Sequence, residues 1–441
     1  MLRIFSDKRT AKACHILSML KTHAKKRHIS FHTPGHKHPK FDLTELSFSD
    51  NLSAPSGCIL KAQTDVAQIL GAKQSFFLTD GSTSGVLSML HALKQAGVKS
   101  LAMPISSHKS VYNGCALLGI APFLFQIKRV DGVPLPLTEK TAGEEVENAL
   151  KNSDALLLTS PDYYGNVADL AYFSDLCKKA GKPLVIDGAH GGHLRFDKTL
   201  YAGNYADMWV DGVHKSLPAF TQGAIVSGKT EEWSERLQNA VDIFRTTSPS
   251  YPIMASVEYA VKYPQNVFLE QAVHDWKEKN AERVYQNADW TKLCAIFGEN
   301  AFDAQSYCIQ KGFYPEFCDG NVLTFYLSPA TKTHDFKRLQ KLLERLFLRF
   351  PNKRSEKQEK TVRQIHTPVV FPKNTANEWV ELENGKGKIC ANTCGLFPPC
   401  TPLIVRGERI TEEKIELLQR ADNVFGLRER KINVFLYDDE A

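Results

Sequence analysis

The sequence predicts an α/β protein with a large domain built on a mostly parallel sheet and a smaller C-terminal α+β domain. Three observations support this prediction. Short, nearly continuous apolar runs alternate with helical patterns between about residues 75 and 230, as in βαβ units. The runs lack strict alternation, which is typical of strands covered by helices on both faces. Beyond about residue 310, strand-like and amphipathic helical segments follow one another without that regular alternation.

Six apolar runs are expected to be strands of the large sheet. They are QSFFLT (74–79), SLAMPI (100–105), ALLLTS (155–160), PLVID (183–187), ADMWVDG (206–212) and GAIVSG (223–228). The first leads through Asp80-Gly81-Ser82-Thr83 into an apolar-periodic helix that ends near Gly97. A further helix is expected after Ser107-His108-Lys109.

The flanking segments divide the chain into three expected parts: an N-terminal helical segment (1–30), the large domain (31–310) and the smaller domain (311–441). In the last part, strands are expected at 321–327, 379–384 and 402–407, and helices at 334–350 and from Thr411. A polar, basic stretch at 351–376 is expected to be a loop.

Composition points to an ordinary globular protein, because 43% of the residues are hydrophobic and 24% are charged. No run approaches the roughly 18 apolar residues of a membrane span, and the first ten residues lack the apolar region of a secretory signal. We therefore expect a cytoplasmic protein with no membrane partner. The net charge of +6 is modest, and no nucleic-acid-binding pattern accompanies the basic runs, so no nucleic-acid partner is expected.

The cysteines give no sign of a metal site. Ten are present, none forms a C-x-x-C pair, and Cys390, Cys394 and Cys400 are poorly spaced for zinc. Reduced, mostly buried thiols explain them better, and we expect no metal.

Lys215 and Asp187 are the first candidates for chemistry. Each lies at or just after the end of an apolar strand, where open α/β sheets bind their ligands. A lysine there can form a Schiff base, and an aspartate can hold the ring nitrogen of pyridoxal 5'-phosphate (PLP) protonated. Taken singly, a surface lysine and an N-cap or loop aspartate are the better explanations of these two residues.

Two further features lie in the same α/β region. The turn from Asp80 to Gly85 offers backbone N–H groups and the hydroxyls of Ser82 and Thr83 to a phosphate. His108 follows the strand SLAMPI, where its ring can stack on a flat cofactor. Each feature alone is ordinary, but their order along one region favours a PLP site.

Six stretches resemble the Orn/Lys/Arg decarboxylase family of fold-type-I PLP enzymes, in the form that lacks an N-terminal wing domain. They are FHTPGHK (31–37), FFLTDGSTSG (76–85), SHKS (107–110), SPDYYG (160–165), IDGAHGGH (186–193) and HKSLPAFTQGA (214–224). The resemblance implies an aspartate aminotransferase-like large domain and PLP as cofactor. It also implies decarboxylation of arginine, lysine or ornithine to a polyamine-type amine.

The resemblance also implies roles for individual residues. Lys215 would carry the cofactor, Asp187 would pair with its ring nitrogen, and His108 would stack on the ring; these three are the expected catalytic residues. The other expected cofactor contacts are Ala189 on the second ring face, His190 beside the ring substituents, and Ser82, Thr83 and His214 at the phosphate. Thr221 and Gln222 would lie at the interface of a homodimer, or a higher homo-oligomer, with shared active sites.

The chain departs from the family pattern at several positions. Gly212 replaces a phosphate-binding hydroxyl residue, Gly188 replaces a glutamate, and Asn392 and Cys400 alter the C-terminal signature. These departures leave two alternatives open: another PLP enzyme, such as an aminotransferase or lyase, or a degenerate PLP-binding protein. The acidic residue for the substrate's distal cation stays open among Asp42, Glu45, Asp50 and Asp162.

Overall fold

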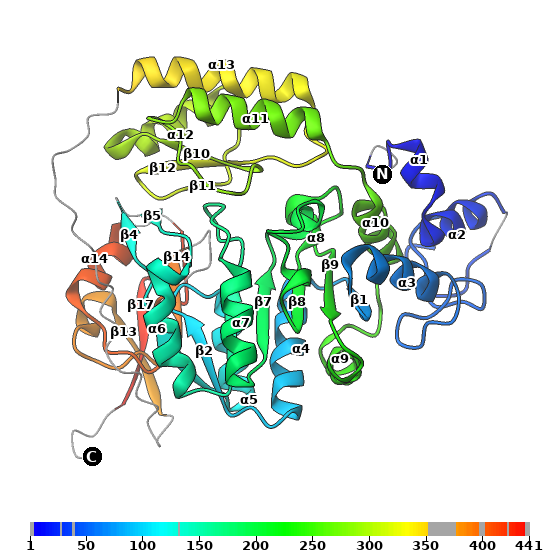
Figure 1. The fold of residues 1–441 in the computed structure, drawn as a ribbon, viewed down its shortest axis with the longest axis horizontal. Helices are drawn as coiled ribbons and strands as arrows, with labels where there is room; N and C mark the ends of the chain where they lie inside the picture. Colours follow the sequence, from blue (N-terminus) through cyan, green and yellow to red (C-terminus); the bar gives the residue numbers. More distant parts are fainter. Residues whose placement is uncertain are drawn as a thin grey trace.

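A seven-stranded sheet forms the centre of the computed structural model (Figure 1). The structure describes residues 4–26, 29–37, 40–130, 133–351, 376–396, 402–420 and 423–436. In spatial order the strands are β1 (Gln74–Leu78), β9 (Ala224–Gly228), β8 (Met208–Asp211), β7 (Leu184–Gly188), β6 (Ala155–Thr159), β2 (Ser100–Pro104) and β3 (Ala121–Phe125). Only β9 runs against its neighbours, so the sheet is mostly parallel, as predicted.

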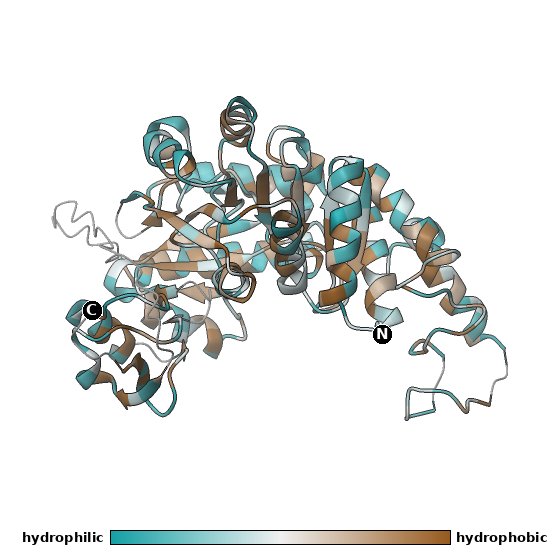
Figure 2. Ribbon diagram, turned by 90° about the horizontal axis from the view of Figure 1, so that it is seen from below, coloured by the Kyte–Doolittle hydropathy of each residue, from teal (hydrophilic) through white to brown (hydrophobic). Residues whose placement is uncertain are grey.

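Helices cover both faces of this sheet. One face packs against α4 (Ser82–Gln95), α5 (Lys109–Leu118) and α9 (Glu231–Phe244). The other packs against α2 (His15–Ala24), α3 (Cys58–Leu70), α6 (Glu139–Lys151), α7 (Leu170–Ala180) and α10 (Tyr251–Lys262). Apolar colours gather on the strands and on the inward sides of these helices (Figure 2). This double covering explains why the central strands are apolar without alternation.

The six strands predicted for this sheet are confirmed, and β3 was missed. Its sequence, APFLF, contains Pro122, and β3 is the edge strand with two exposed and two half-buried residues. An edge strand tolerates proline and partial exposure, so it gives a weaker apolar signal than a central strand.

Two smaller units follow the large sheet. In the first, β10 (Lys292–Ile296), β12 (Val322–Tyr326) and β11 (Phe317–Cys318) form an antiparallel sheet that packs with α11 (Val267–Lys279), α12 (Ala301–Gln310) and α13 (Thr333–Arg349). Because β10 pairs with β12 across the expected boundary at residue 310, we propose that this unit begins near residue 265.

The second small unit contains two short sheets and one helix. The pair β13 (Asn377–Glu381) and β17 (Lys431–Phe435) is antiparallel, as are β15 (Pro402–Ile404), β14 (Cys394–Leu396) and β16 (Val424–Phe425), and α14 (Glu412–Arg420) packs with them. Of the expected loop at 351–376, only the first and last residues lie among the described residues. Cys400 lies outside them.

The described part of the chain also contains shorter elements. The N-terminal segment contributes α1 (Lys8–Lys12) before α2, β4 (Arg129–Val130) pairs antiparallel with β5 (Val133–Pro134), and the short helix α8 (Val213–Ser216) follows β8. The described part of the N-terminal segment thus contains two helices, α1 and α2.

Candidate active site

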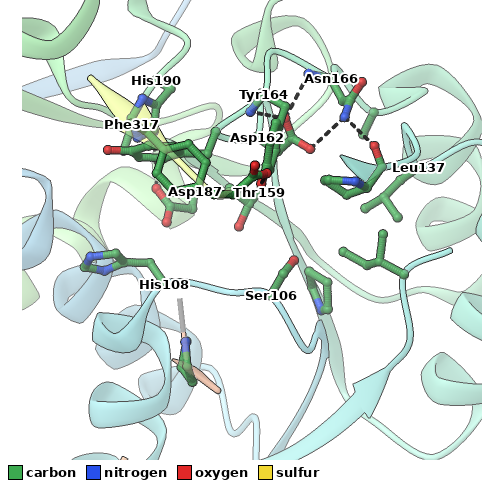
Figure 3. A pocket seen from close by; sticks show the side chains of 18 of the residues that line it. Ser106, His108, Leu137, Thr159, Asp162, Tyr164, Asn166, Asp187, His190 and Phe317 are labelled. Atoms are coloured by element: carbon green, nitrogen blue, oxygen red, sulfur yellow. Dashed lines mark hydrogen bonds between the residues drawn. The ribbon is translucent and has the colours of Figure 1, made fainter. Parts of the chain in front are cut away.

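A cavity of about 340 Å³ lies where the carboxyl ends of the central strands meet the smaller units (Figure 3). It brings together six of the eight predicted site residues: Ser82, His108, Asp187, Ala189, His190 and Lys215. The other two, Thr83 and His214, do not line it: Thr83 is exposed, and His214 Nδ1 lies 2.9 Å from the carbonyl oxygen of Gly223. The predicted stretches therefore converge on one site.

Strand register explains this convergence. Thr159 on β6 pairs with Asp187 on β7, and Asp187 pairs with Val210 on β8. Parallel neighbours place their carboxyl ends at one edge of the sheet. The loop after β7 carries Ala189 and His190, and α8 returns Lys215 to the same edge directly after β8.

Lys215 and His190 form the central contact of the site, with 3.0 Å between Lys215 Nζ and His190 Nε2. The His190 side chain is buried, and its ring packs edge-on against Tyr163 and Tyr326, at centroid distances of 5.0 and 5.7 Å. Burial, followed by the positive charges of Lys215 and Lys292, holds the pKa of His190 well below its usual range. A neutral imidazole therefore faces the Lys215 amine.

Asp187 is a buried carboxylate with few partners among the residues that the structure describes. It is 3% exposed, and its Oδ1 accepts one hydrogen bond, of 3.2 Å, from the backbone N–H of Ala189. Burial raises the pKa of Asp187, and the nearby Lys215 opposes that rise. A cationic group placed against this carboxylate would stabilise its ionised form.

The imidazole of His108 is fixed by the start of α5. Its Nδ1 lies 2.8 Å from Ser110 Oγ and accepts the Ser110 backbone N–H at 3.2 Å. Burial, with the charges of Lys215 and Lys109, lowers the pKa of His108 to about 4. A neutral, oriented ring on the cavity wall suits stacking against a flat aromatic ligand.

Two glycines in the site allow close approach of the strands' ends. A Cβ on Gly188 would lie 2.9 Å from the carbonyl oxygen of Val210, and one on Gly212 would collide with the carbonyl oxygen of Ala189. The family's hydroxyl residue therefore has no room at position 212 unless the Ala189 backbone moves. Gly188 thus allows the close approach of β7 to β8, and Gly212 allows that of the loops that follow these two strands.

The residues present fit PLP. Asp187 offers an underpaired carboxylate to a ring nitrogen, His108 and Ala189 line the same cavity, and Ser82 begins α4 next to Gly81, where helix N–H groups favour a phosphate. Thr159 Oγ1 and His190 Nδ1 are buried without a hydrogen-bond partner among the described residues. Such unsatisfied atoms around a cavity indicate a ligand site.

Several lining residues were not assigned a role from sequence. They are Ser106, Thr159, Tyr163, Tyr164, Phe317 and Asp319. Thr159 pairs with Asp187 near the carboxyl end of an apolar strand, so its position near a strand end was an available signal. Phe317 and Asp319 come from the first small unit, more than 100 residues beyond Lys215, and no local pattern marks them.

Only one of the four acidic candidates for the substrate's distal cation lines the cavity. Asp162 does so, and burial raises its pKa to about 6, although its carboxylate also accepts hydrogen bonds from the backbone N–H groups of Tyr164 and Asn166 and from the Asn166 amide. Asp50 instead accepts backbone N–H groups of Ser56, Gly57 and Ile59. Asp42 pairs with His36, and Glu45 accepts a hydrogen bond from Thr44. These three have local structural partners.

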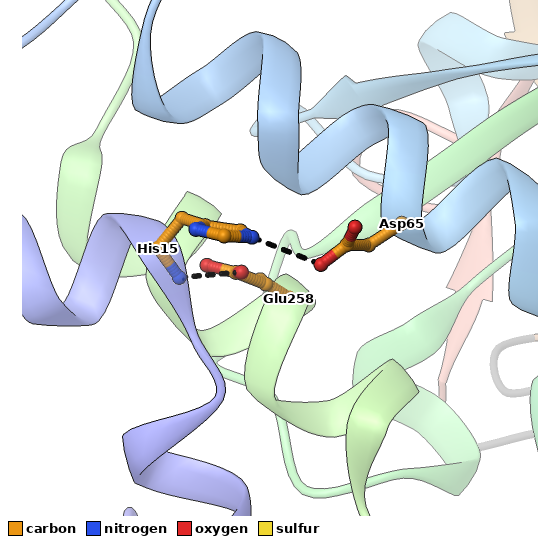
Figure 4. Close-up of side chains that lie close together, drawn as sticks. All are labelled: His15, Asp65 and Glu258. Atoms are coloured by element: carbon orange, nitrogen blue, oxygen red, sulfur yellow. Dashed lines mark hydrogen bonds and ion pairs between the residues drawn. The ribbon is translucent and has the colours of Figure 1, made fainter.

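One cluster of potential metal ligands occurs among the described residues: His15, Asp65 and Glu258 (Figure 4). Lys262 Nζ already lies 2.6 Å from Asp65 Oδ2 and 2.9 Å from Glu258 Oε1. Glu258 also accepts the backbone N–H groups of His15 and Ile16 at the start of α2. Because an ammonium occupies the position of a cation, this cluster is a structural contact between α2, α3 and α10.

None of the helices in the described parts of the chain has both the length and the apolar composition needed to cross a bilayer.

Comparison with known proteins places these features in a family. The model of the Orn/Lys/Arg decarboxylase major domain matches residues 39–345. An arginine decarboxylase of Bacillus subtilis is 27% identical over 455 residues, covering 90% of this chain and 91% of the relative. The structure of the Escherichia coli constitutive lysine decarboxylase superposes with a TM-score of 0.71 at 18% identity, covering 95% of this chain and 81% of that one. A structure of SPT with PLP, at a TM-score of 0.56 and 12% identity, covers 77% of this chain and 85% of its own. The chain therefore belongs to the Orn/Lys/Arg decarboxylase family.

Proposed function

We propose that this chain is a PLP-dependent decarboxylase that converts arginine, lysine or ornithine into CO2 and the corresponding amine. Membership of the family and similarity to an arginine decarboxylase support the reaction class. The observation that carries the proposal is the contact between Lys215 Nζ and His190 Nε2, next to the buried carboxylate of Asp187.

Lys215 would hold the cofactor covalently, and His190 would orient the Lys215 amine. His190 Nε2 faces Lys215 Nζ at 3.0 Å, so the neutral imidazole can accept a hydrogen bond from this amine and fix its direction. An amine without its proton is the nucleophilic form of lysine. Tyr163 and Tyr326 cover the imidazole on two sides and limit the access of water.

Asp187 would hold the cofactor's ring nitrogen. His108 and Ala189 would face the ring, and Ser82 would contact the phosphate. When bound, PLP supplies an electron sink for the electron pair that remains as a carboxylate leaves as CO2. The carboxylate of Asp187 favours a protonated nitrogen, because an opposite charge in a buried site strongly stabilises a cation.

The substrate's distal cation would be received on the acidic side of the cavity. Asp162 and Asp319 both line it, and Asp319 Oδ2 accepts a hydrogen bond of 2.6 Å from Tyr164. Leu135, Leu137 and Phe317 line the cavity as well and would contact a methylene chain. An acidic group at the end of an apolar wall is complementary to a basic amino acid.

The protein would act as a cytoplasmic homodimer with shared active sites. Thr221 and Gln222 are exposed, and the carbonyl of Gln222 accepts the N–H of Gly81 at the expected phosphate turn. Ile29 and Phe31 are 79% and 89% exposed, which favours burial against a second copy. Light scattering of the purified protein should give twice the mass of 49.4 kDa.

An absorbance spectrum and a CO2 assay test the function together. The wild-type protein with PLP should show a Schiff-base band that shifts with one of arginine, lysine or ornithine, and CO2 should be released from that amino acid. A band that shifts without CO2 release would favour an aminotransferase or lyase. A band that none of the three amino acids affects would favour a degenerate PLP-binding protein, and the absence of any band would contradict the cofactor.

A further inference from the structure

A network of charged and polar side chains is buried between the large domain and the first small unit. His193 Nε2 lies 2.8 Å from Asp289 Oδ1, and Lys292 Nζ lies 3.2 Å from Asp289 Oδ2. Asp289 and Lys292 are fully buried, and His193 is 2% exposed. Thr291 completes the network, since its hydroxyl donates to Asp289 at 2.6 Å and accepts from Lys292 at 3.0 Å.

This network is costly to bury. Removing ions from water costs on the order of several kcal/mol for each, and apolar residues often replace such groups without loss of stability. Burial would raise the pKa of Asp289, but His193 and Lys292 hold it well below its usual range. The ions therefore persist as a pair, in a place where an apolar contact would serve packing equally well.

Lys292 contacts Tyr326, a residue that packs against the active site. It pairs with Tyr326 across β10 and β12, and its Nζ lies 4.3 Å from the centre of the Tyr326 ring. The Tyr326 hydroxyl donates to the carbonyl of Tyr163 at 3.0 Å, and the ring packs edge-on against His190. His190 in turn contacts Lys215.

We propose that Lys292 is a positioning residue of the active site. Anchored by Asp289 and Thr291, its ammonium fixes the ring of Tyr326, and through that ring it holds the His190 imidazole against Lys215. Because Lys292 is fully buried, its cation–π contact is stronger than one at an exposed site and restricts the ring. The role in catalysis rests on the proposed function, whereas the effect on His190 can be measured without it.

The charge of Lys292 also acts on His190. The charged or titratable groups around this imidazole come from five parts of the chain: Lys215, Lys292 with Asp289, His108, Tyr163 and Tyr326. Lys215, Lys292 and His108 disfavour a protonated His190, and Asp289 favours it. Removing the charge of Lys292 leaves Asp289 less balanced, so His190 should take up a proton at a higher pH.

The test compares Lys292→Met with Lys277→Met in the holoenzyme. Lys277 is also buried in the small unit, but its Nζ contacts Asn287 instead of Tyr326, so its loss controls for a missing buried cation. Lys292→Met should lower kcat roughly 10- to 100-fold, as small misplacements in active sites do, with KM within about threefold. The acidic limb of its kcat profile should move upward by about 0.5 pH unit or more. Lys277→Met should leave that limb in place.

A second measurement on the apoprotein separates this proposal from the proposed function. Protein with ¹⁵N-labelled histidine reports the titration of each imidazole, and His190→Gln assigns the His190 signal. Lys292→Met should raise the titration midpoint of His190, and Lys277→Met should not. An unchanged midpoint together with an unchanged kcat profile would overturn the proposal. If the wild type releases no CO2 from any basic amino acid, the proposed function fails and the titration alone decides the role of Lys292.

A double variant covers the case in which Lys292→Met does not fold. Asp289→Asn with Lys292→Met leaves no uncompensated buried charge between these two positions, so it should be better tolerated. It should still lower kcat about 10-fold, because the Lys292 ammonium no longer restrains the Tyr326 ring. Wild-type kcat in the folded double variant would overturn the proposal.

Discussion

Two clusters of the chain contain the same kinds of side chain and differ in how their polar atoms are satisfied. In the N-terminal cluster of His15, Asp65, Glu258 and Lys262, the Lys262 ammonium donates to Ala13, Asp65 and Glu258, and Glu258 accepts two backbone N–H groups. In the cavity around Lys215, Thr159 Oγ1 and His190 Nδ1 are buried without a partner among the described residues.

This difference separates a structural cluster from a binding site. Buried polar atoms are nearly always hydrogen-bonded, so a saturated cluster contributes to stability and has little capacity left for a ligand. An undersaturated cluster on a cavity wall has that capacity. Removing a residue from the N-terminal cluster should therefore change stability, whereas removing one from the cavity should change chemistry.

Lys215→Ala should have the largest effect of any single substitution. Without the ε-amino group no covalent attachment of PLP is possible, so turnover and the Schiff-base band should both be lost. The melting temperature should stay close to that of the wild type, because the Lys215 side chain is only half-buried. Borohydride reduction followed by peptide mapping checks the attachment, and PLP found on another lysine of the variant would refute the assignment.

Asp187→Asn should lower kcat by roughly 10³-fold, comparable with the loss of one well-placed electrostatic group. The amide retains the shape of the carboxylate but cannot favour a protonated ring nitrogen. The Schiff-base band should remain, which distinguishes this variant from Lys215→Ala. Stopped-flow or CO2-release kinetics with saturating PLP give the value, and near-normal kcat would contradict the role of Asp187.

Gly212→Ser tests whether the missing hydroxyl can simply be restored. A Cβ at this position collides with the carbonyl oxygen of Ala189, so the loops after β7 and β8 must separate. We expect PLP affinity to fall about tenfold rather than rise, because a displacement of Ala189 disturbs its place on the cavity wall. Titration of the apoprotein with PLP measures the affinity; tighter binding would show that the hydroxyl outweighs the collision.

The central sheet and the residues near its strand ends could be predicted from the sequence, and the reason is physical. A parallel strand covered on both faces is a continuous apolar run, and the polar residue that ends the run lies at the ligand edge. Asp187 follows this rule near the end of β7, and Lys215 reaches the same edge from α8, directly after β8. Their convergence with His108 and Ser82 could therefore be anticipated before the strands were placed in space.

Other features depended on contacts that no local pattern encodes. Lys292 reaches Tyr326 only through the register of β10 and β12, and their face meets His190 only when the small unit packs on the large domain. Gly212 was interpreted as a missing hydroxyl, although its close approach to Ala189 is what the backbone requires. Both depend on distances between segments far apart in sequence.

Glu258→Gln should have the smallest effect on activity. It tests whether the N-terminal cluster contributes to stability only. Glu258 is fully buried and contacts Lys262 as well as the first N–H groups of α2. The amide oxygen can still accept a hydrogen bond, but the charge of Lys262 is then balanced only by Asp65. The free energy of unfolding should fall by about 3 kcal/mol, the lower end for a broken buried ion pair.

Denaturant titration measures this loss, and kcat/KM below the unfolding transition should stay within about twofold of the wild type. A large fall in kcat/KM with unchanged stability would show that the N-terminal cluster takes part in the reaction, and saturation of its polar atoms would then be no guide to function in this chain.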